Sequence, residues 1–448
     1  MSQAKKGLPG LSASLKDKLI QQALQRKLRQ AGQEQGSRSV PLAPARKGNI
    51  SEEFYRFDMH PGYRQLRIMN EGAARMGVRS PFFKLHEGTA GADTRIGGKS
   101  YVNYASYNYL GMSGDPVVQA AAREAMERYG TSVSASRLVS GERPIHRELE
   151  QALAELYDVD DAVAFVSGHA TNVSVIGYLF GPRDLILHDE FIHNSVLQGA
   201  QLSGARRLPF AHNDWAALDA ILDEQRHQFE RVLIVLEGLY SMDGDFPDLP
   251  RFVEIKRRHK AFLMVDEAHS LGVMGKRGYG IREHFGLAGK DVDIWMGTLS
   301  KTLAGCGGYI AGEAALVEHL KFLAPGFLYS VGMPPAVAAA SLAALRRMQE
   351  VPERVAALQA RGRFFLQHAR AAGIDTGSSA GLAVVPAITA SSLKAARLSA
   401  ALFEHQINVQ PILYPAVPEQ TARLRFFISC LHSESQLTRT LEILSKII

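Results

Sequence analysis

The sequence is poor in cysteine and has no long apolar run. Only Cys306 and Cys430 occur in 448 residues, which excludes a disulfide framework and a zinc site built from four thiolates. A reduced, cytoplasmic protein is therefore expected. No stretch of about 18 uninterrupted apolar residues occurs. Residues 1–10 hold two lysines and no apolar segment, so we expect neither a membrane span nor a signal peptide.

The composition also lacks any strong bias. Hydrophobic residues make up 46% and charged residues 21% of the chain, which is typical of a globular protein and excludes the disordered and collagen-like classes. One domain usually takes about 100 to 200 residues, so a length of 448 residues predicts two or three domains. The sequence shows no internal repeat of about 20 to 50 residues, which argues against a solenoid.

Positive charge is concentrated at the N-terminus. Residues 1–49 contain ten lysines and arginines but only two acidic residues, a net charge of +8 in a chain whose net charge is +6. Apolar residues recur at helical spacing over residues 14–30, which predicts an amphipathic helix, and the polar residues 31–48 predict a linker. We expect residues 1–48 to be a basic arm that docks onto an acidic partner or stays a solvated tail.

Short apolar runs alternate with helical periods from about residue 145 onward. Continuous apolar runs predict strands that are buried on both faces, as in a parallel sheet covered by helices. These runs are Ala162–Val166, Leu185–His188, Val232–Glu237, Ala261–Asp266 and Asp293–Met296. The pattern after Pro334 predicts helices over residues 335–349 and 353–371 and strands over residues 383–387 and 423–429.

The sequence therefore predicts an α/β fold with a mostly parallel central sheet. Residues 49–100 are predicted to be the N-terminal segment of the catalytic body. Residues 101–333 are predicted to form a large domain, and residues 334–448 a smaller α+β domain.

Chemically active residues follow the predicted strands, at the edge where open α/β sheets bind ligands. Asp266 ends one strand, and His269 follows three residues later. A buried carboxylate needs compensation, so we expect Asp266 to meet a positive group such as a protonated ring nitrogen. The alternative is that Asp266 only caps the start of a helix, which would explain the aspartate but not the histidine three residues later.

Lys301 lies in a loop of hydroxyls and glycines directly after another strand. Thr298 and Ser300 precede it, and three glycines follow. Burial lowers the pKa of a lysine toward the neutral amine that forms a Schiff base. The two hydroxyls suit a phosphate group. A surface lysine beside a loop is the alternative.

Other motifs are weak signals when taken singly. Ser167-Gly168-His169 leads from a strand into a helix, and the first N–H groups of a helix bind phosphate well. His193 and Ser241 lie in two polar segments further along the chain. A lone histidine or a tight turn is structural more often than functional.

Taken together in this order, the motifs resemble the α-oxoamine synthase family of pyridoxal phosphate enzymes over residues 80–445. The motifs are YNYLG (107–111), Ser136-Arg137 with Gly141 and His146, SGHATN (167–172), HNS (193–195), EGLYSMDGD (237–245), VDEAH (265–269), GTLSK (297–301) and YPAVPEQTARLRFFIS (414–429). The family includes 8-amino-7-oxononanoate, 5-aminolevulinate, 2-amino-3-ketobutyrate and serine palmitoyl condensing enzymes. The resemblance implies the fold type I architecture, pyridoxal phosphate as cofactor, no metal, and a homodimer with active sites at the subunit interface.

The resemblance also implies roles for individual residues. Lys301 resembles the lysine that forms a Schiff base with the cofactor, Asp266 the partner of the ring nitrogen, and His193 the histidine that stacks on the ring. Arg425 is similar to the arginine that receives the substrate carboxylate, and Ser330 to a residue that reaches the partner subunit's phosphate. The implied catalytic residues are Lys301, His193, Asp266 and His269. Further implied contacts are Ser167, Gly168, His169, Ser241, His269, Thr298 and Ser300 to the cofactor, and Tyr107 and Asn108 to the substrate.

The implied reaction joins glycine, alanine or serine to an acyl thioester and releases carbon dioxide, which leaves an α-aminoketone. Tyr107 stands where the oxononanoate and aminolevulinate enzymes usually have asparagine. In this respect the sequence is more similar to serine palmitoyl and polyketide-associated enzymes. The acyl donor is either coenzyme A or an acidic carrier protein, which the basic arm would attract.

Two alternatives stay open. Another fold type I enzyme, such as an aldolase or an aminotransferase, would share Lys301 and Asp266 but not the whole set of motifs. A non-catalytic partner subunit is the other, although inactive family members lack the lysine that is present here. No basic patch interleaved with aromatic residues supports nucleic-acid binding.

Overall fold

The computed structural model describes residue 22, residues 50–75 and residues 80–448. The predicted basic arm, residues 1–48, lies outside the described residues except for residue 22. The chain divides into two compact units, residues 1–83 and residues 84–448. In the first unit, short turns at Glu52–Phe54 and Phe57–Met59 precede helix α2, Pro61–Arg75. No helix in these described ranges is long and apolar enough to cross a membrane.

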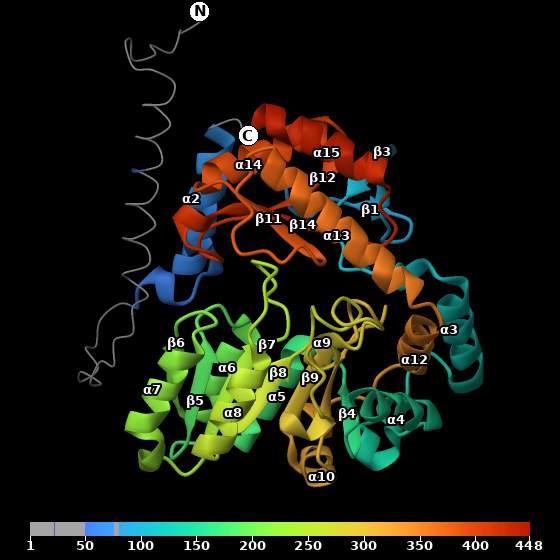
Figure 1. The fold of residues 1–448 in the computed structure, drawn as a ribbon, viewed down its shortest axis with the longest axis vertical. Coiled ribbons are helices and arrows are strands. Elements are labelled where there is room, and N and C mark those ends of the chain that lie inside the picture. The colour runs from blue at the N-terminus through green and yellow to red at the C-terminus, as the bar shows by residue number, and fades with distance from the viewer. Residues whose placement is uncertain (1–21, 23–49, 76–79) are drawn as a thin grey trace, which may run out of the picture. The chain divides into compact units, whose positions relative to one another are not determined.

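A seven-stranded sheet forms the centre of the second unit (Figure 1). Its strands are β4 (Asp161–Phe165), β5 (Leu185–Asp189), β6 (Arg206–Phe210), β7 (Val232–Glu237), β8 (Phe262–Asp266), β9 (Ile294–Thr298) and β10 (Gly308–Gly312), in the order β4-β10-β9-β8-β7-β5-β6. β10 runs antiparallel to β4 and β9, and the other neighbours run parallel. The predicted mostly parallel sheet is confirmed.

Both faces of this sheet are buried, which explains the continuous apolar runs. Along β7, Leu233 and Val235 belong to one hydrophobic cluster, whereas Ile234 and Leu236 belong to the other. Successive strand residues point to opposite faces, and a sheet covered on both faces therefore needs no polar alternation. The helices of this part are α3 (Pro116–Tyr129), α4 (Pro144–Tyr157), α5 (Gly168–Leu179), α6 (Asn194–Ser203), α7 (Trp215–Gln225), α8 (Leu249–His259), α9 (Gly280–Phe285), α10 (Ala314–Leu323), α11 (Pro325–Leu328) and α12 (Pro335–Glu350).

Strands β6 and β10 give no clear signal in the sequence. β6 is an edge strand with a single neighbour, β5, and its Arg206 and Arg207 are exposed. Polar side chains are usual on such an edge. β10 begins at Gly308 and ends at Gly312, and glycine has little intrinsic preference for strands.

The C-terminal part of the chain carries two smaller sheets. β11 (Val384–Ile388), β14 (Arg423–Phe427) and β13 (Gln410–Ile412) form one, and β11 and β14 confirm the predicted strands. β1 (His86–Glu87), β2 (Asp93–Ile96), β3 (Lys99–Asn103) and β12 (Ile407–Asn408) form the other. The helices are α13 (Glu353–Ala371), α14 (Ser392–Glu404) and α15 (Glu434–Ile447). Because β12 pairs with β3, residues 86–103 fold with the end of the chain. The predicted domain boundaries stay predictions.

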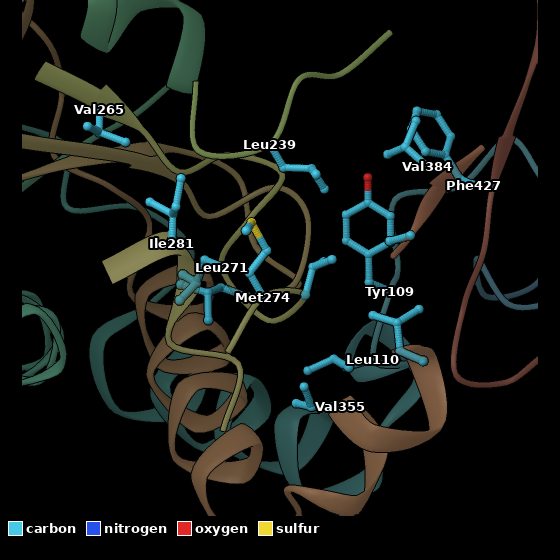
Figure 2. Packing of buried hydrophobic residues seen from close by; sticks show 14 of the residues in the cluster. Tyr109, Leu110, Leu239, Val265, Leu271, Met274, Ile281, Val355, Val384 and Phe427 are labelled. Atoms are coloured by element: carbon cyan, nitrogen blue, oxygen red, sulfur yellow. The ribbon is translucent and has the colours of Figure 1, made fainter. Parts of the chain in front are cut away.

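Buried apolar side chains join the large sheet to the C-terminal strands. Figure 2 shows Tyr109 beside Phe427 and Val384, with Leu239 on the side of the large sheet. All four are almost completely excluded from solvent. This packing holds β14, and with it Arg425, close to the carboxyl edge of the large sheet.

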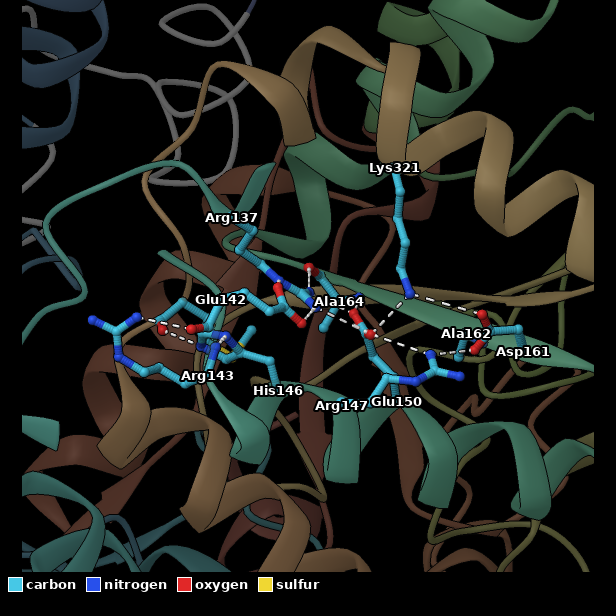
Figure 3. Close-up of polar contacts among 11 residues, drawn as sticks. Arg137, Glu142, Arg143, His146, Arg147, Glu150, Asp161, Ala162, Ala164 and Lys321 are labelled. Carbon is cyan, nitrogen blue, oxygen red and sulfur yellow. Dashed lines mark hydrogen bonds and ion pairs between the residues drawn. The ribbon is translucent and has the colours of Figure 1, made fainter. Parts of the chain in front are cut away.

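A buried ion-pair network ties the turn that begins at Arg137 to α4 and β4 (Figure 3). Arg137 Nη1 donates to Glu150 Oε1 at 2.5 Å, and Arg137 Nη2 donates to Glu142 Oε1 at 2.7 Å. Glu150 is fully buried, accepts the backbone N–H of Ala164 at 2.9 Å and pairs with Lys321 Nζ at 3.1 Å. The charge of Glu150 is therefore compensated on several sides, as a buried carboxylate requires.

Replacing Glu150 by alanine should lower the free energy of unfolding by about 3 kcal/mol, because it leaves the buried Arg137 with Glu142 as its remaining carboxylate partner and removes the acceptor of the Ala164 N–H and the partner of Lys321. Denaturant unfolding followed by circular dichroism measures this loss. Glu230→Ala is the control, because it removes an exposed pair with Arg183 and should cost less than about 1 kcal/mol. Equal losses in the two variants would contradict the role given to the network.

Candidate active site

A cavity surrounds Lys301 at the carboxyl ends of the parallel strands. It encloses about 390 Å³ of empty space, part of it open to solvent. Its lining residues are Gly168, His169, Asn172, His193, Ser195, Glu237, Asp266, Ala268, His269, Met296, Thr298 and Lys301. The structure thus brings together seven predicted residues from four separate stretches of the chain.

Lys301 follows β9 and is the lysine that lines this cavity. Burial lowers the pKa of Lys301 to about 8, although the carboxyl groups of Asp266 and Glu237 oppose the shift. The Nζ atom lies 5.7 Å from the centre of the Tyr107 ring. The amine is therefore partly neutral near neutral pH, and the neutral amine is the form that attacks a carbonyl group.

Asp266 ends β8 and is 4% exposed. Asn172 Nδ2 donates to its Oδ2 at 2.9 Å, and the backbone N–H of Ala268 donates to its Oδ1 at 3.0 Å. Hydrogen bonds from N–H groups favour the ionised form of a carboxyl. Asp266 thus offers a fixed negative charge inside the cavity.

His193 and His269 are each hydrogen-bonded to a hydroxyl group at Nδ1. The Ser195 hydroxyl lies 2.7 Å from His193 Nδ1 and itself accepts from Asn172 Nδ2, so its proton goes to the imidazole. The buried Tyr109 hydroxyl lies 2.7 Å from His269 Nδ1. Burial lowers the pKa of His193, and burial lowers the pKa of His269 well below its usual value. Both rings are therefore neutral. The Ser195 N–H also donates to His193 Nδ1 at 3.3 Å, so His193 presents Nε2–H as a donor.

The start of α5 faces the loop that carries Lys301. Ser167 caps this helix by accepting the Ala170 N–H at 3.3 Å. A Cβ at Gly168 would lie 2.8 Å from Thr298 Oγ1, so glycine permits the close approach. Ser300 Oγ accepts the Gly307 N–H at 3.4 Å. A helix start flanked by hydroxyl groups is an arrangement suited to an anion.

The two arginines of β14 have different partners. Arg423 Nη1 donates to Asp243 Oδ1 at 2.5 Å, so Asp243 neutralises the charge of Arg423. Arg425 Nη1 donates to the Ser241 carbonyl oxygen at 3.0 Å, and its guanidinium lies 4.6 Å from the centre of the Phe427 ring. Arg425 pairs with no carboxylate among the described residues, which leaves its charge for a ligand.

Seven predicted residues lie outside the lining of this cavity. Four of them, Ser167, Ser241, Ser300 and Arg425, take part in the contacts given above, and the other three are Ser330, Tyr107 and Asn108. Ser330 lines another cavity and donates to the Gly326 carbonyl oxygen at 2.7 Å. Tyr107 is 41% exposed, and its ring is edge-on to that of Phe427. The Asn108 amide donates to the Ala90 carbonyl oxygen at 2.6 Å and to Ser113 Oγ at 2.7 Å, so its donors hold the local turn.

The structure adds four residues that sequence reasoning did not select. Asn172 and Ser195 connect Asp266 to His193. Tyr109 holds His269. Glu237 is 3% exposed and lines the cavity. All four occur in the motifs of the sequence, but each acts through a contact with a distant segment, which no local pattern reveals.

Comparisons with known proteins agree with this geometry. Residues 99–444 match the family of class I and II aminotransferases. An 8-amino-7-oxononanoate synthase from Symbiobacterium thermophilum is 40% identical over 352 residues, which cover 79% of this chain and 89% of that protein.

Two solved structures are similar in fold. A serine palmitoyltransferase from S. paucimobilis with bound pyridoxal phosphate–myriocin aldimine has a TM-score of 0.82 and 29% identity, over 86% of this chain and 97% of the other. An 8-amino-7-oxononanoate synthase from Francisella tularensis has a TM-score of 0.68 and 27% identity, over 77% of this chain and 97% of the other.

Proposed function

We propose a role in catalysis for each residue of this site. The chain belongs to the class I and II aminotransferase family, in which it is an α-oxoamine synthase. The enzyme depends on pyridoxal phosphate and condenses a small amino acid with an acyl thioester, with loss of carbon dioxide. The observation that carries our proposal is the burial of Lys301 and Asp266 in one cavity.

The residues of the cavity fit this cofactor. Gly168 leaves room that a Cβ would fill, beside the Thr298 hydroxyl and the start of α5, and these groups would hold the phosphate together with Ser167, His169 and Ser300. Lys301 would hold the aldehyde carbon. When bound, pyridoxal phosphate supplies an electron sink for the bonds at Cα of the amino acid.

Asp266 would keep the ring nitrogen protonated, because its charge is buried and held by two N–H donors. His193 would lie against the ring. His269 would donate from Nε2 to the phenolic oxygen, and Ser241 lies on the same side, next to Arg425.

Arg425 would bind the amino-acid substrate, and Lys301 would remove its proton. Arg425 would receive the carboxylate of the amino acid in its planar fork. Lys301, displaced as a free amine of lowered pKa, would take the proton from Cα. Cα would form a bond to the carbonyl carbon of the thioester as the C–S bond breaks and the thiolate leaves to be protonated by solvent. The bond from Cα to the carboxylate would then break with release of carbon dioxide, and the proton held by Lys301 would return to Cα.

We further propose a homodimer in which Ser330 reaches the partner subunit's cofactor phosphate. Ser330 lines a cavity with Arg137 rather than with Lys301. Beside it, Tyr329 and Val139 are 82% and 80% exposed, and a bridge from Ser136 to Val331 joins their segments. Large exposed apolar side chains of this kind mark an interaction surface.

For the acyl donor, we propose an acidic carrier protein that docks on the basic arm. The arm lies outside the described residues, and its net charge of +8 over residues 1–49 is the support for this proposal. Opposite surface charges speed encounter between proteins, and salt screens this effect over about 8 to 10 Å.

Purified holoenzyme titrated with glycine, alanine and serine should show a spectral change with at least one of them, and that amino acid should yield an α-aminoketone with a member of a thioester panel, detected by mass spectrometry. Lys301→Ala should abolish both the cofactor absorbance of the Schiff base and turnover. Near-normal turnover in that variant would refute the role of Lys301.

Arg425→Ala should weaken amino-acid binding by about 1.5 to 3 kcal/mol, the size of a hydrogen-bonded charge contact. A spectral titration measures the dissociation constant. Arg423→Gln is the matched control, because Arg423 lies two residues away on the same strand but is paired with Asp243. It should lower stability and weaken amino-acid binding much less than Arg425→Ala does, because the amide of glutamine can still donate to Asp243. Unchanged affinity in Arg425→Ala would assign the carboxylate to another group.

Deletion of residues 1–48 should raise the KM for a carrier-bound acyl donor much more than the KM for a small thioester, and it should remove the salt dependence of the first. Amino-acid binding should not change, because every proposed active-site residue lies beyond Phe82. Equal kinetics with the two donors before and after the deletion would refute docking by the arm.

A further inference from the structure

Two carboxyl groups end neighbouring strands beside Lys301. Glu237 is the last residue of β7 and Asp266 the last residue of β8, and the two are paired across these parallel strands. Both line the cavity, and both are nearly excluded from solvent, at 3% and 4% exposure. Two carboxyls that share one buried space cannot both carry a charge at low cost.

Their hydrogen bonds decide which of the two is charged. Asp266 receives an N–H group on each oxygen, from Asn172 and Ala268. Glu237 receives the Ser241 N–H on Oε2 at 3.2 Å, and its buried Oε1 has no hydrogen-bond partner among the described residues. The negative charge is therefore better stabilised on Asp266, which leaves the proton on Glu237.

The charged groups around Glu237 come from several elements. Asp266 and Asp189, at the ends of β8 and β5, disfavour a second negative charge. Lys301 and the Ser241 N–H favour it. Burial is the largest influence, and together with Asp266 it raises the pKa of Glu237 to about 8.

Glu237 and Arg425 both contact the backbone of Ser241, one at its N–H group and the other at its carbonyl oxygen. The Ser241 N–H donates to Glu237, and the Ser241 carbonyl oxygen accepts from Arg425 Nη1 at 3.0 Å. The buried Nε of Arg425 has no partner among the described residues. A negative charge on Glu237 stabilises the charge of Arg425, so an ionised Glu237 would act as an internal competitor for that guanidinium.

We propose that Glu237 is a positioning residue that retains its proton and thereby keeps Arg425 available for the carboxylate of the amino-acid substrate. This inference rests on the proposed role of Arg425. When pH rises, Glu237 loses its proton to solvent, and the resulting carboxylate competes for Arg425 and repels the substrate carboxylate. Amino-acid affinity is therefore limited at high pH by a group that does not touch the substrate.

Amino-acid binding by the wild-type holoenzyme should weaken above about pH 8, by up to about tenfold for each further pH unit. Glu237→Gln keeps the shape of the side chain but cannot ionise. The weakening of amino-acid binding that is due to Glu237 above about pH 8 should therefore disappear in this variant. A second ligand, an amine that lacks a carboxylate group, serves as the comparison. Its binding should not respond to the ionisation of Glu237, because it has no carboxylate group for Arg425 to receive. Identical pH profiles for the amino acid and the amine in the wild-type enzyme would overturn the inference, and this comparison needs no variant.

Infrared spectroscopy tests the proton on Glu237 without any reference to Arg425. The wild-type protein at pH 7 should show the carbonyl band of a protonated carboxyl, which isotope-labelled glutamate shifts and Glu237→Gln removes. Glu267→Gln is the matched control, because Glu267 is also fully buried but lies outside the cavity lining. It should leave the Glu237 band and the pH profile of binding unchanged. A spectrum without a band due to Glu237 would overturn this inference but leave the proposed role of Arg425 intact. Unchanged amino-acid affinity in Arg425→Ala would overturn both the inference and the proposed contact of Arg425 with the substrate.

Thermal unfolding of the protein without cofactor supplies an independent measurement. The pKa of Glu237 is raised on folding from 4.5 to about 8, so the wild-type protein loses stability as pH rises through this range, because the unfolded chain releases the proton first. Glu237→Gln should therefore gain in melting temperature relative to the wild type between pH 5 and about pH 8. A constant difference over this range would contradict a proton held by Glu237.

Discussion

The burial of charged groups at the carboxyl edge of one sheet is the constraint on which the rest of this structure depends. Lys301, Asp266 and Glu237 line one small cavity, and the two carboxyl groups are almost completely excluded from solvent. A charge in such a place is expensive unless hydrogen bonds or opposite charges offset its desolvation. Each group therefore takes the protonation state that its neighbours allow, and the chemistry of the enzyme follows from those states.

A hydrogen-bonded chain of side chains meets this constraint for Asp266 and His193. Asn172 donates both to Asp266 and to Ser195, and Ser195 in turn holds His193. One amide on α5 thus orients both the carboxylate of Asp266 and, through Ser195, the imidazole of His193 in the cavity. The positions of these groups are set by α5, α6 and β8, which are rigid elements, and this gives the precision that a reacting cofactor needs.

The C-terminal strands complete the site from the other side. The ion pair of Arg423 with Asp243 anchors β14 to the loop after β7. The same loop supplies Ser241, whose backbone N–H donates to Glu237 and whose carbonyl oxygen accepts from Arg425. Substrate recognition and the protonation of Glu237 are therefore linked through the backbone of one residue, although the two side chains are far apart in sequence.

The sequence by itself determined the architecture and seven of the residues that line the cavity around Lys301. Continuous apolar runs identified five strands of the large sheet, because burial on both faces removes polar alternation. Its motifs identified Lys301, Asp266, His193 and Arg425 as the residues to examine. The sequence did not predict strands β6 and β10, because their composition does not distinguish them from loops. β6 is an edge strand, and β10 is bounded by glycines. Tertiary structure alone decided that Asn172 holds Asp266, that Arg423 is paired while Arg425 is not, and that Glu237 lies beside Asp266. These facts depend on contacts between segments separated by many residues, and protonation states depend on burial, which a linear pattern does not contain.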